Sequence, residues 1–366
     1  MSARPVDRAA ARRHLEALAR APRPAGGQEE ARARAYCADV LSASGLAVAE
    51  EPFSYSAVPG RMATPLLGAV SGALFATVGH LGWRNEPALA LAVLLGGAAT
   101  LGGVAWWITR FGVLGLPWFR AQSSNLVASR GNPSVWLVAH LDSKSQPVAI
   151  VVRALGVIGL IVTALAAVGV GALHVAGTEV RWAWPWITAL GVLASLPVAA
   201  SVVRSRSPGA LDDASGVSTV LMVAQSLPHQ LALGVVLTSA EELGLAGARA
   251  WVRGRGAVHA INLDGIDDEG ALRFTWTRRR PTSLLELLAA RAGEAGVPAS
   301  VGRLIPGVLL DGVALADAGW QVVTVSRGTF RTVARIHTPR DSLEHLSGEG
   351  IAITASIILA AVATSA

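Results

Sequence analysis

The chain has 366 residues, enough for one large α/β domain or two ordinary ones, but its 52% hydrophobic residues and mean hydropathy of +0.47 exceed the values of an average soluble protein. The net charge of +6 comes almost entirely from arginine, since Lys144 is the only lysine, and the arginines are not interleaved with aromatic residues as in a nucleic-acid-binding surface. No nucleic-acid partner is therefore expected, and the single cysteine, Cys37, excludes an internal disulfide framework.

The N-terminal part of the chain predicts two helices and a strand. Asp7 is a suitable N-cap for the first helix, which must end before Pro22. The second helix is amphipathic and is predicted over residues 28–44, with Gly45 as its terminator. A strand over residues 46–53 follows.

Four apolar stretches then interrupt the chain in two pairs, and a short polar turn separates the members of each pair. Each stretch approaches the roughly 20 residues that a helix needs to cross a bilayer. They predict two transmembrane helical hairpins, over residues 62–109 and 148–203, with a set of buried core helices as the alternative. The four stretches are residues 62–82, 88–109, 154–175 and 184–203.

The flanks of these stretches indicate a bilayer and an orientation. Tryptophans gather at their ends, as expected for indole rings at the level of the lipid headgroups. Arg84 and Arg181 lie in the two turns, whereas a larger number of basic residues flank the other ends of the apolar stretches. The positive-inside rule therefore places the rest of the chain on the cytoplasmic side of the inner membrane. The basic residues of the opposite ends are Arg61, Arg110, Arg120, Lys144, Arg153, Arg204 and Arg206.

Outside the hairpins, apolar strands alternate with helices, which predicts an α/β fold with a three-layer, mixed but mostly parallel sheet. This domain would comprise residues 1–61, 110–147 and 204–366. The last apolar run, residues 351–366, is too short to span a membrane comfortably and predicts a helix packed on the sheet. Strands are predicted over residues 125–128, 135–140, 232–239, 257–263 and 321–326, and helices over residues 213–227, 242–253 and 283–295.

Two histidines and several acidic residues recur along this framework, some of them just past predicted strands, where active residues of parallel sheets collect. Zinc prefers imidazole and carboxylate ligands, and two zinc ions need one shared carboxylate and two terminal ligands each. The histidines and acidic residues of this chain, taken in order, supply enough ligands for two zinc ions. Any one motif alone has a simpler explanation, since an acidic pair before a helix is usually an N-terminal cap. The set consists of His140, Asp142, Asp212, Glu241, Glu242, Asp264 and His337.

The same residues lie in five ordered motifs that resemble the co-catalytic dizinc exopeptidases, a family that includes secreted bacterial aminopeptidases, glutamate carboxypeptidase and glutaminyl cyclases. Arg23 and the two glycines at 26–27 also look like the start of that family, so the likeness covers the α/β part almost end to end. The motifs are AHLDS at residues 139–143, GALDDASG at 209–216, SAEELGLAG at 239–247, NLD at 262–264 and IHTPRD at 336–341.

Carried over position by position, the resemblance implies a cofactor of two zinc ions that share Asp212 as a bridging ligand. His140 and Asp264 would complete the ligands of one ion. Glu242 and His337 would complete those of the other. The ligand types favour zinc over cobalt or manganese.

The resemblance also implies the catalytic groups. Glu241 would be the general base, which takes a proton from water and delivers it to the departing amine. Asp142 would orient His140 through its second ring nitrogen. A cis peptide bond that the family carries would fall at Asp212–Asp213.

The predicted activity is that of a membrane-anchored zinc exopeptidase, an aminopeptidase that acts on a peptide or aminoacyl substrate. One hairpin precedes the His140 strand and the other lies between His140 and Asp212, so the cleft is expected near the bilayer surface. A peptide or acylated amide would then approach along the membrane. A glutaminyl-cyclase-like acyl transferase is the nearest alternative, and a non-enzymatic membrane receptor or scaffold of the same fold is the second.

Other residues are weaker candidates. Asp311 resembles the family's aspartate before the penultimate strand, although Gly312 follows where a bulkier residue is usual. Arg327 could clamp a substrate carboxylate, with a structural ion pair as the alternative. His174, near the end of an apolar stretch, is expected to be a packing residue.

Overall fold

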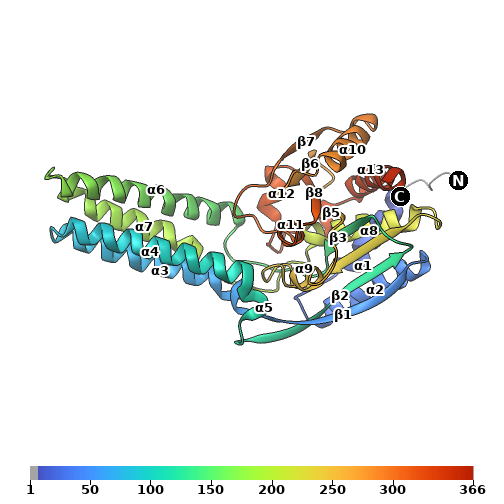
Figure 1. Cartoon of the computed structure of the whole chain (residues 1–366), viewed down its shortest axis with the longest axis horizontal. Coiled ribbons are helices and arrows are strands. Elements are labelled where there is room, and N and C mark those ends of the chain that lie inside the picture. Colours follow the sequence, from blue (N-terminus) through green and yellow to red (C-terminus); the bar gives the residue numbers. More distant parts are fainter. Residues whose placement is uncertain (1–6, 366) are drawn as a thin grey trace. The chain divides into compact units, whose positions relative to one another are not determined.

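The structure is a computed structural model that describes residues 7–365. The described chain divides into two compact units, both drawn in Figure 1. The α/β unit contains the residues up to Tyr55, Arg120–Ser145 and the residues from Ser205 onward. The helical unit contains Ser56–Phe119 and Gln146–Arg204.

The α/β unit is built on an eight-stranded sheet with the order β1-β2-β4-β3-β5-β8-β6-β7. The pairs β3–β4, β3–β5, β5–β8 and β6–β7 are parallel, whereas β2–β4 and β6–β8 are antiparallel. The prediction of a mixed, mostly parallel sheet is confirmed. The strands are β1 Ala47–Ser56, β2 Arg120–Arg130, β3 Val135–His140, β4 Leu233–Thr238, β5 His259–Ile266, β6 Ala271–Trp276, β7 Ala299–Arg303 and β8 Gln321–Gly328.

Helices cover both faces of this sheet, because successive side chains of a strand point to opposite faces. Leu137 of β3 joins the larger core, beneath the first set of helices, and Val138 joins the smaller core, beneath the second. The first set is α1 Arg8–Leu18, α2 Gln28–Ala43, α8 Gly216–Ser226, α10 Thr282–Glu294 and α13 Glu349–Ser365; the second is α9 Ala246–Trp251 and α11 Asp311–Asp317. A further short helix, α12 Phe330–Arg335, follows β8.

The helical unit is a bundle of four long helices that run alongside one another in Figure 1. Helix α3 packs on α4 and α7, and α6 packs on the same two helices, so the four form a closed ring. The helices are α3 Val58–Trp83, α4 Pro87–Trp107, α6 Ile150–Val175 and α7 Trp184–Ala199; a π-helical turn, Ile108–Gly112, and α5, Val113–Gly115, extend α4, and a 3-10 turn, Arg181–Ala183, precedes α7.

Glycines allow α3 and α7 to approach closely. A Cβ on Gly68 would lie 2.2 Å from the backbone nitrogen of Ala199, and a Cβ on Gly79 would lie 1.7 Å from Thr188 Oγ1. Small residues at helix interfaces serve the same purpose in membrane proteins, where packing rather than water exclusion drives association. All four helices are long and apolar enough to cross a membrane.

Polar contacts join the two turns of the helical unit. The Trp184 indole N–H donates to His174 Nδ1 at 3.0 Å, and His174 Nε2 lies 2.9 Å from Asn85 Oδ1. Arg181 Nε donates to the carbonyl oxygen of Trp83 at 2.6 Å, and its guanidinium lies over the Trp83 ring. The packing role expected for His174 fits these contacts.

The structure corrects two predicted helices. Of residues 242–253 only α9 is helical, because Ala240 and Leu245 have positive φ angles of 54° and 62° and the segment between them is a turn. Helix α8 starts at Gly216 and not at residue 213, because Asp213 has a non-helical backbone. Strands β6 and β7 were not predicted, and β7 is mostly exposed and lacks an apolar run.

Candidate active site

The acidic residues and histidines of the five motifs meet at one edge of the sheet. His140 ends β3, Glu241 and Glu242 occupy the turn after β4, and Asp264 lies near the end of β5. The carboxyl ends of neighbouring parallel strands lie together, which explains why residues far apart in sequence converge. Asp212 arrives from the segment that leads into α8.

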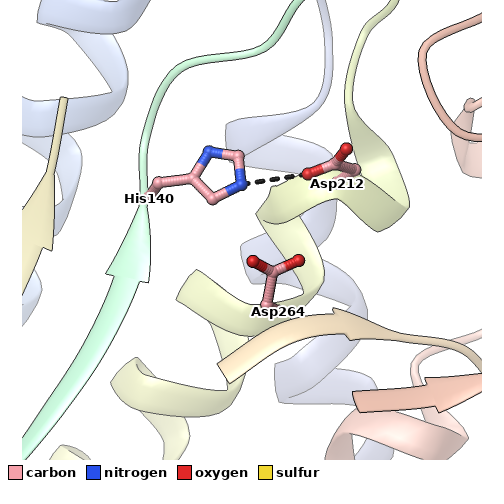
Figure 2. A group of neighbouring side chains, drawn as sticks. All are labelled: His140, Asp212 and Asp264. Carbon is pink, nitrogen blue, oxygen red and sulfur yellow. Dashed lines mark hydrogen bonds and ion pairs between the residues drawn. The ribbon is translucent and has the colours of Figure 1, made fainter. Parts of the chain in front are cut away.

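His140, Asp212 and Asp264 form the first group of potential metal ligands, shown in Figure 2. Each offers one ligand atom, and these atoms lie within 4.8 Å of one another. His140 Nε2 is 2.9 Å from Asp212 Oδ1. His140 and Asp212 are buried and Asp264 is half-buried.

Asp212, Glu242 and His337 form the second group. His337 Nε2 lies 3.0 Å from Asp212 Oδ2 and 3.1 Å from Glu242 Oε1. The two oxygens of Asp212 therefore face two different imidazoles, one in each group. Ligand atoms about 2.0–2.1 Å from a tetrahedral zinc ion lie about 3.3 Å from one another, close to the separations found here. The donor set and its spacing fit a pair of zinc ions that share Asp212.

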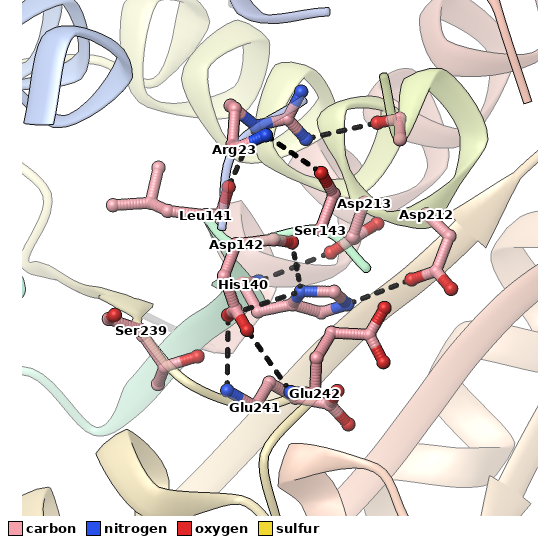
Figure 3. Close-up of polar contacts among 12 residues, drawn as sticks. Arg23, His140, Leu141, Asp142, Ser143, Asp212, Asp213, Ser239, Glu241 and Glu242 are labelled. Carbon is pink, nitrogen blue, oxygen red and sulfur yellow. Dashed lines mark hydrogen bonds and ion pairs between the residues drawn. The ribbon is translucent and has the colours of Figure 1, made fainter. Parts of the chain in front are cut away.

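Asp142 supports both His140 and the acidic pair (Figure 3). Its carboxylate accepts hydrogen bonds from the backbone N–H groups of Glu241 at 3.0 Å and Glu242 at 3.2 Å. His140 Nδ1 lies 3.0 Å from the backbone oxygen of Asp142 and 3.7 Å from its carboxylate. Asp142 thus fixes the acidic turn with its side chain and contacts the imidazole mainly through its main chain.

Two further aspartates position Asp212. The Asp341 carboxylate accepts from the backbone N–H groups of Leu211 at 2.6 Å and Asp212 at 3.2 Å. The Asp213 carboxylate accepts from the backbone of His140, Gly216 and Gly265, the last two being at 2.9 and 3.2 Å. The peptide bond Asp212–Asp213 is cis.

Arg23 ties the segments behind the site together. Its buried guanidinium donates to the carbonyl oxygen of Leu141 at 2.7 Å (Figure 3). It also donates to the carbonyl oxygens of Pro208 at 2.6 Å and Gly209 at 3.0 Å. Its backbone exchanges hydrogen bonds with Ser143. One side chain therefore joins the loop after β3 to the segment that carries Asp212.

Glu30, at the start of α2, is buried behind the acidic turn. It accepts hydrogen bonds from the hydroxyls of Ser123 and Ser239 and from the backbone N–H of Gly26. Burial, and then the charge of Asp142, raises the pKa of Glu30 to about 7. Ser239 opens the turn of Glu241, so Glu30 anchors that turn to the N-terminal helices.

The electrostatics divide the acids into two kinds. Burial would raise the pKa of Asp212, but hydrogen bonds from His140 and His337 hold it well below its ordinary value. Burial also opposes ionisation of Glu242, yet His337 and Lys144 lower its pKa to about 2. These residues keep their charge in the folded chain.

The other acids favour the neutral form. Burial raises the pKa of Glu241 well above its ordinary value, with His140 acting against this shift and Glu242 adding to it. Burial and the charge of Asp212 raise the pKa of Asp264 to about 7. Several buried carboxyl groups this close together are stabilised in their charged form by a bound cation. Such a cluster of shifted pKa values is typical of functional sites.

The sequence did not single out every residue that shapes the site. Asp213 and Asp341 lie inside the quoted motifs, and their placement next to Asp212 and His337 was the available signal. Glu30 had no recognisable signal. The sequence marks Lys144 only as a charge that flanks the second hairpin, whereas in the structure its Nζ lies 2.5 Å from Glu242 Oε2. Arg327 donates to the carbonyl oxygen of Gly270.

The comparisons with known proteins identify the family and the fold that the chain resembles. Residues 195–362 match the model of peptidase family M28. The resemblance to the co-catalytic zinc exopeptidases is confirmed. The segment that matches the M28 model contains Asp212, the acidic pair, Asp264 and His337, whereas His140 precedes it. No curated protein matches the chain.

Solved structures share the fold at low sequence identity. The aminopeptidase from Aneurinibacillus sp. strain AM-1 has a TM-score of 0.58 at 16% identity, over 98% of this chain and 93% of that chain. The zinc aminopeptidase BSAP from Bacillus subtilis has a TM-score of 0.57 at 16% identity, over 99% and 95%. The Fimbriiglobus ruber glutaminyl cyclase has a TM-score of 0.57 at 15% identity, over 99% and 97%.

The M28 match and these neighbours support a metallopeptidase-type hydrolase with a zinc exopeptidase-like function. The potential ligand groups themselves consist of imidazole and carboxylate donors, which zinc prefers. The glutaminyl cyclases among the neighbours leave the reaction within this class open.

Proposed function

We propose that the chain is a membrane-anchored zinc aminopeptidase that binds two metal ions. The observation that carries the proposal is the division of five potential ligands into two groups that share Asp212. His140 and Asp264 would hold one ion, and Glu242 and His337 the other. Zinc bound here would polarise the scissile carbonyl and lower the pKa of water to near neutrality.

The protein residues then have separate tasks. Glu241, beside the acidic ligands but in neither ligand group, would take a proton from the attacking water and deliver it to the departing amine. Asp142 holds the backbone of Glu241 and so fixes the direction of this side chain. Asp341 and Asp213 hold the segment that presents Asp212.

The proposal is tested by zinc content together with hydrolysis of aminoacyl and N-blocked dipeptide substrates. We expect two zinc ions per chain and cleavage of substrates with a free amine only. Glu241→Gln should keep the zinc and lose at least about 100-fold in kcat, because general-base help contributes that much. Equal cleavage of N-blocked substrates, or intact hydrolysis in Glu241→Gln, would rule the assignment out.

Glutaminyl cyclisation is the second candidate, favoured by the glutaminyl cyclases among the structural neighbours. It differs in product, since the N-terminal glutamine of a peptide would close into a ring instead of a residue being released. The two reactions are separated by mass analysis of a glutaminyl peptide after incubation with the zinc-loaded chain.

We also propose that the four long helices cross the inner membrane and that the α/β unit faces the cytoplasm. Their length and apolar character support insertion. Basic residues near the ends that lead into the α/β unit support the orientation. A substrate that reaches the site along the bilayer, a peptide or acylated amide, would explain why one hairpin precedes the His140 strand and the other lies between His140 and Asp212.

A further inference from the structure

Lys144, the only lysine of the chain, lies against one residue of the proposed metal centre. It follows β3 by four positions, and its side chain is only 18% exposed. Its Nζ is 2.5 Å from Glu242 Oε2 and 3.4 Å from the backbone oxygen of the same residue. The lysine therefore contacts both the carboxylate and the main-chain oxygen of Glu242.

Because of this contact, the two carboxylate oxygens of Glu242 have different neighbours. Oε2 faces Lys144, whereas Oε1 lies 3.1 Å from His337 Nε2 and has no hydrogen bond within the described part of the chain. Oε1 is thus directed into the second ligand group, the one that includes Asp212. The backbone N–H of Glu242 is held by Asp142, so both ends of the residue are fixed.

A carboxylate can hold a cation with one oxygen or with both. A catalytic metal needs an open position for water or substrate, which a second carboxylate oxygen would fill. We propose that Lys144 is a positioning residue that restricts Glu242 to a single oxygen at the second metal position and so keeps a coordination position open. This inference rests on the proposed dizinc function.

The charge of Lys144 has a second effect in the same direction. An ammonium group at hydrogen-bond distance draws electron density from the carboxylate, so Glu242 donates less to a bound cation. A cation bound there would remain a stronger acid towards the substrate carbonyl. Partners behind a ligand commonly change metal affinity or activity by about 10–100-fold when they are removed.

Other roles for Lys144 give different kinetic results. A lysine that bound a substrate carboxylate would raise KM on its removal and leave metal binding unchanged. A lysine that only stabilised the fold would cause loss of metal and activity together. The proposed role predicts a third outcome, in which activity falls while metal binding is kept or strengthened.

The experiment compares Lys144→Met with the wild type, both as purified full chains in detergent loaded with zinc. We expect kcat to fall by about 10-fold or more with KM unchanged. The zinc dissociation constants, from competition with a chelator, should stay equal or become lower. Zinc X-ray absorption should show additional oxygen coordination, and Lys144→Arg should restore most of kcat.

Arg206→Met is the matched control, because it removes a neighbouring exposed positive charge that is not placed at Glu242. It should leave kcat and zinc binding unchanged. Lys144→Leu, which also removes both the donor and the charge, provides the same comparison if the methionine variant unfolds.

The inference is overturned if Lys144→Met keeps full kcat, raises KM alone, or loses zinc in proportion to activity. A failure of the proposed function itself would give a different result. The wild-type chain would then bind no pair of zinc ions or would hydrolyse no aminoacyl substrate, whichever residue stands at position 144.

Discussion

Glu30 is a buried acid behind the site that is not among the potential metal ligands. Its carboxylate holds the hydroxyl groups of Ser123 and Ser239, and its pKa of about 7 lies well above the value of about 4.3 for a glutamate in an unfolded chain. Between these two values the folded chain holds a proton that the unfolded chain releases. Stability from this group is thus complete below the unfolded pKa and is lost as the pH rises through about 7.

Glu30→Gln should therefore remove a pH dependence of folding. The amide stays neutral at every pH, so the variant should gain stability relative to the wild type between pH 5 and pH 8, by up to about 3 kcal/mol. Denaturant unfolding at several pH values measures this difference. Glu16→Gln, at an exposed helix position, is the control and should show no such trend. A constant difference between Glu30→Gln and wild type across this range would contradict the expectation.

Potential metal ligands were predictable from the sequence, because their residue types and order indicate a metal site. Residues that position those ligands through hydrogen bonds to the backbone were not predictable. The motifs pointed to His140 and Asp212 because imidazole and carboxylate in a set order indicate a metal. The role of Asp341 depends on which N–H groups reach its carboxylate, which only the folded chain decides. For Lys144 the partner lies 98 positions away, beyond any local pattern.

At the scale of elements, the long and strongly apolar helices were the most predictable, and short elements near the site were the least. The helix expected over residues 242–253 lost its first turn because Gly244 and Leu245 have positive φ angles of 104° and 62°, which a right-handed helix cannot contain. The folded backbone at this turn thus overrode a local preference. The edge strand β7 lacks the apolar alternation that identifies strands.

The packing of α3 against α7 gives a prediction at this scale. Gly68→Val places side-chain carbon where the backbone of Ala199 lies, and backbone cannot move aside as a flexible side chain does. We expect a loss of about 1–3 kcal/mol, typical of overpacking. Thermal unfolding of the detergent-solubilised chain measures it.

Gly96→Val is the matched control for that variant. Gly96 lies in α4 and has no atom within 4 Å of the position of an added Cβ among the described residues. It should leave the unfolding temperature nearly unchanged. Equal effects of the two substitutions would argue against a close α3–α7 interface.

For the whole molecule, the proposed membrane topology is open to a labelling test. After Cys37→Ala, a cysteine at Glu179 in the second turn should react with a membrane-impermeant maleimide in spheroplasts. A cysteine at Glu269, exposed in the α/β unit, should react only after lysis. The reverse pattern would place the α/β unit outside the cytoplasm, and labelling of both sites would remove the case for membrane crossing.

The two units are threaded through each other along the sequence, with four passages of the chain between them. During synthesis His140 leaves the ribosome before the second pair of long helices, and Asp212, Glu242, Asp264 and His337 leave it afterwards. The nascent polypeptide therefore lacks the full set of proposed ligands until the second pair of helices has been made. Under the proposed function, metal acquisition is a step of maturation that follows the synthesis of both helical pairs.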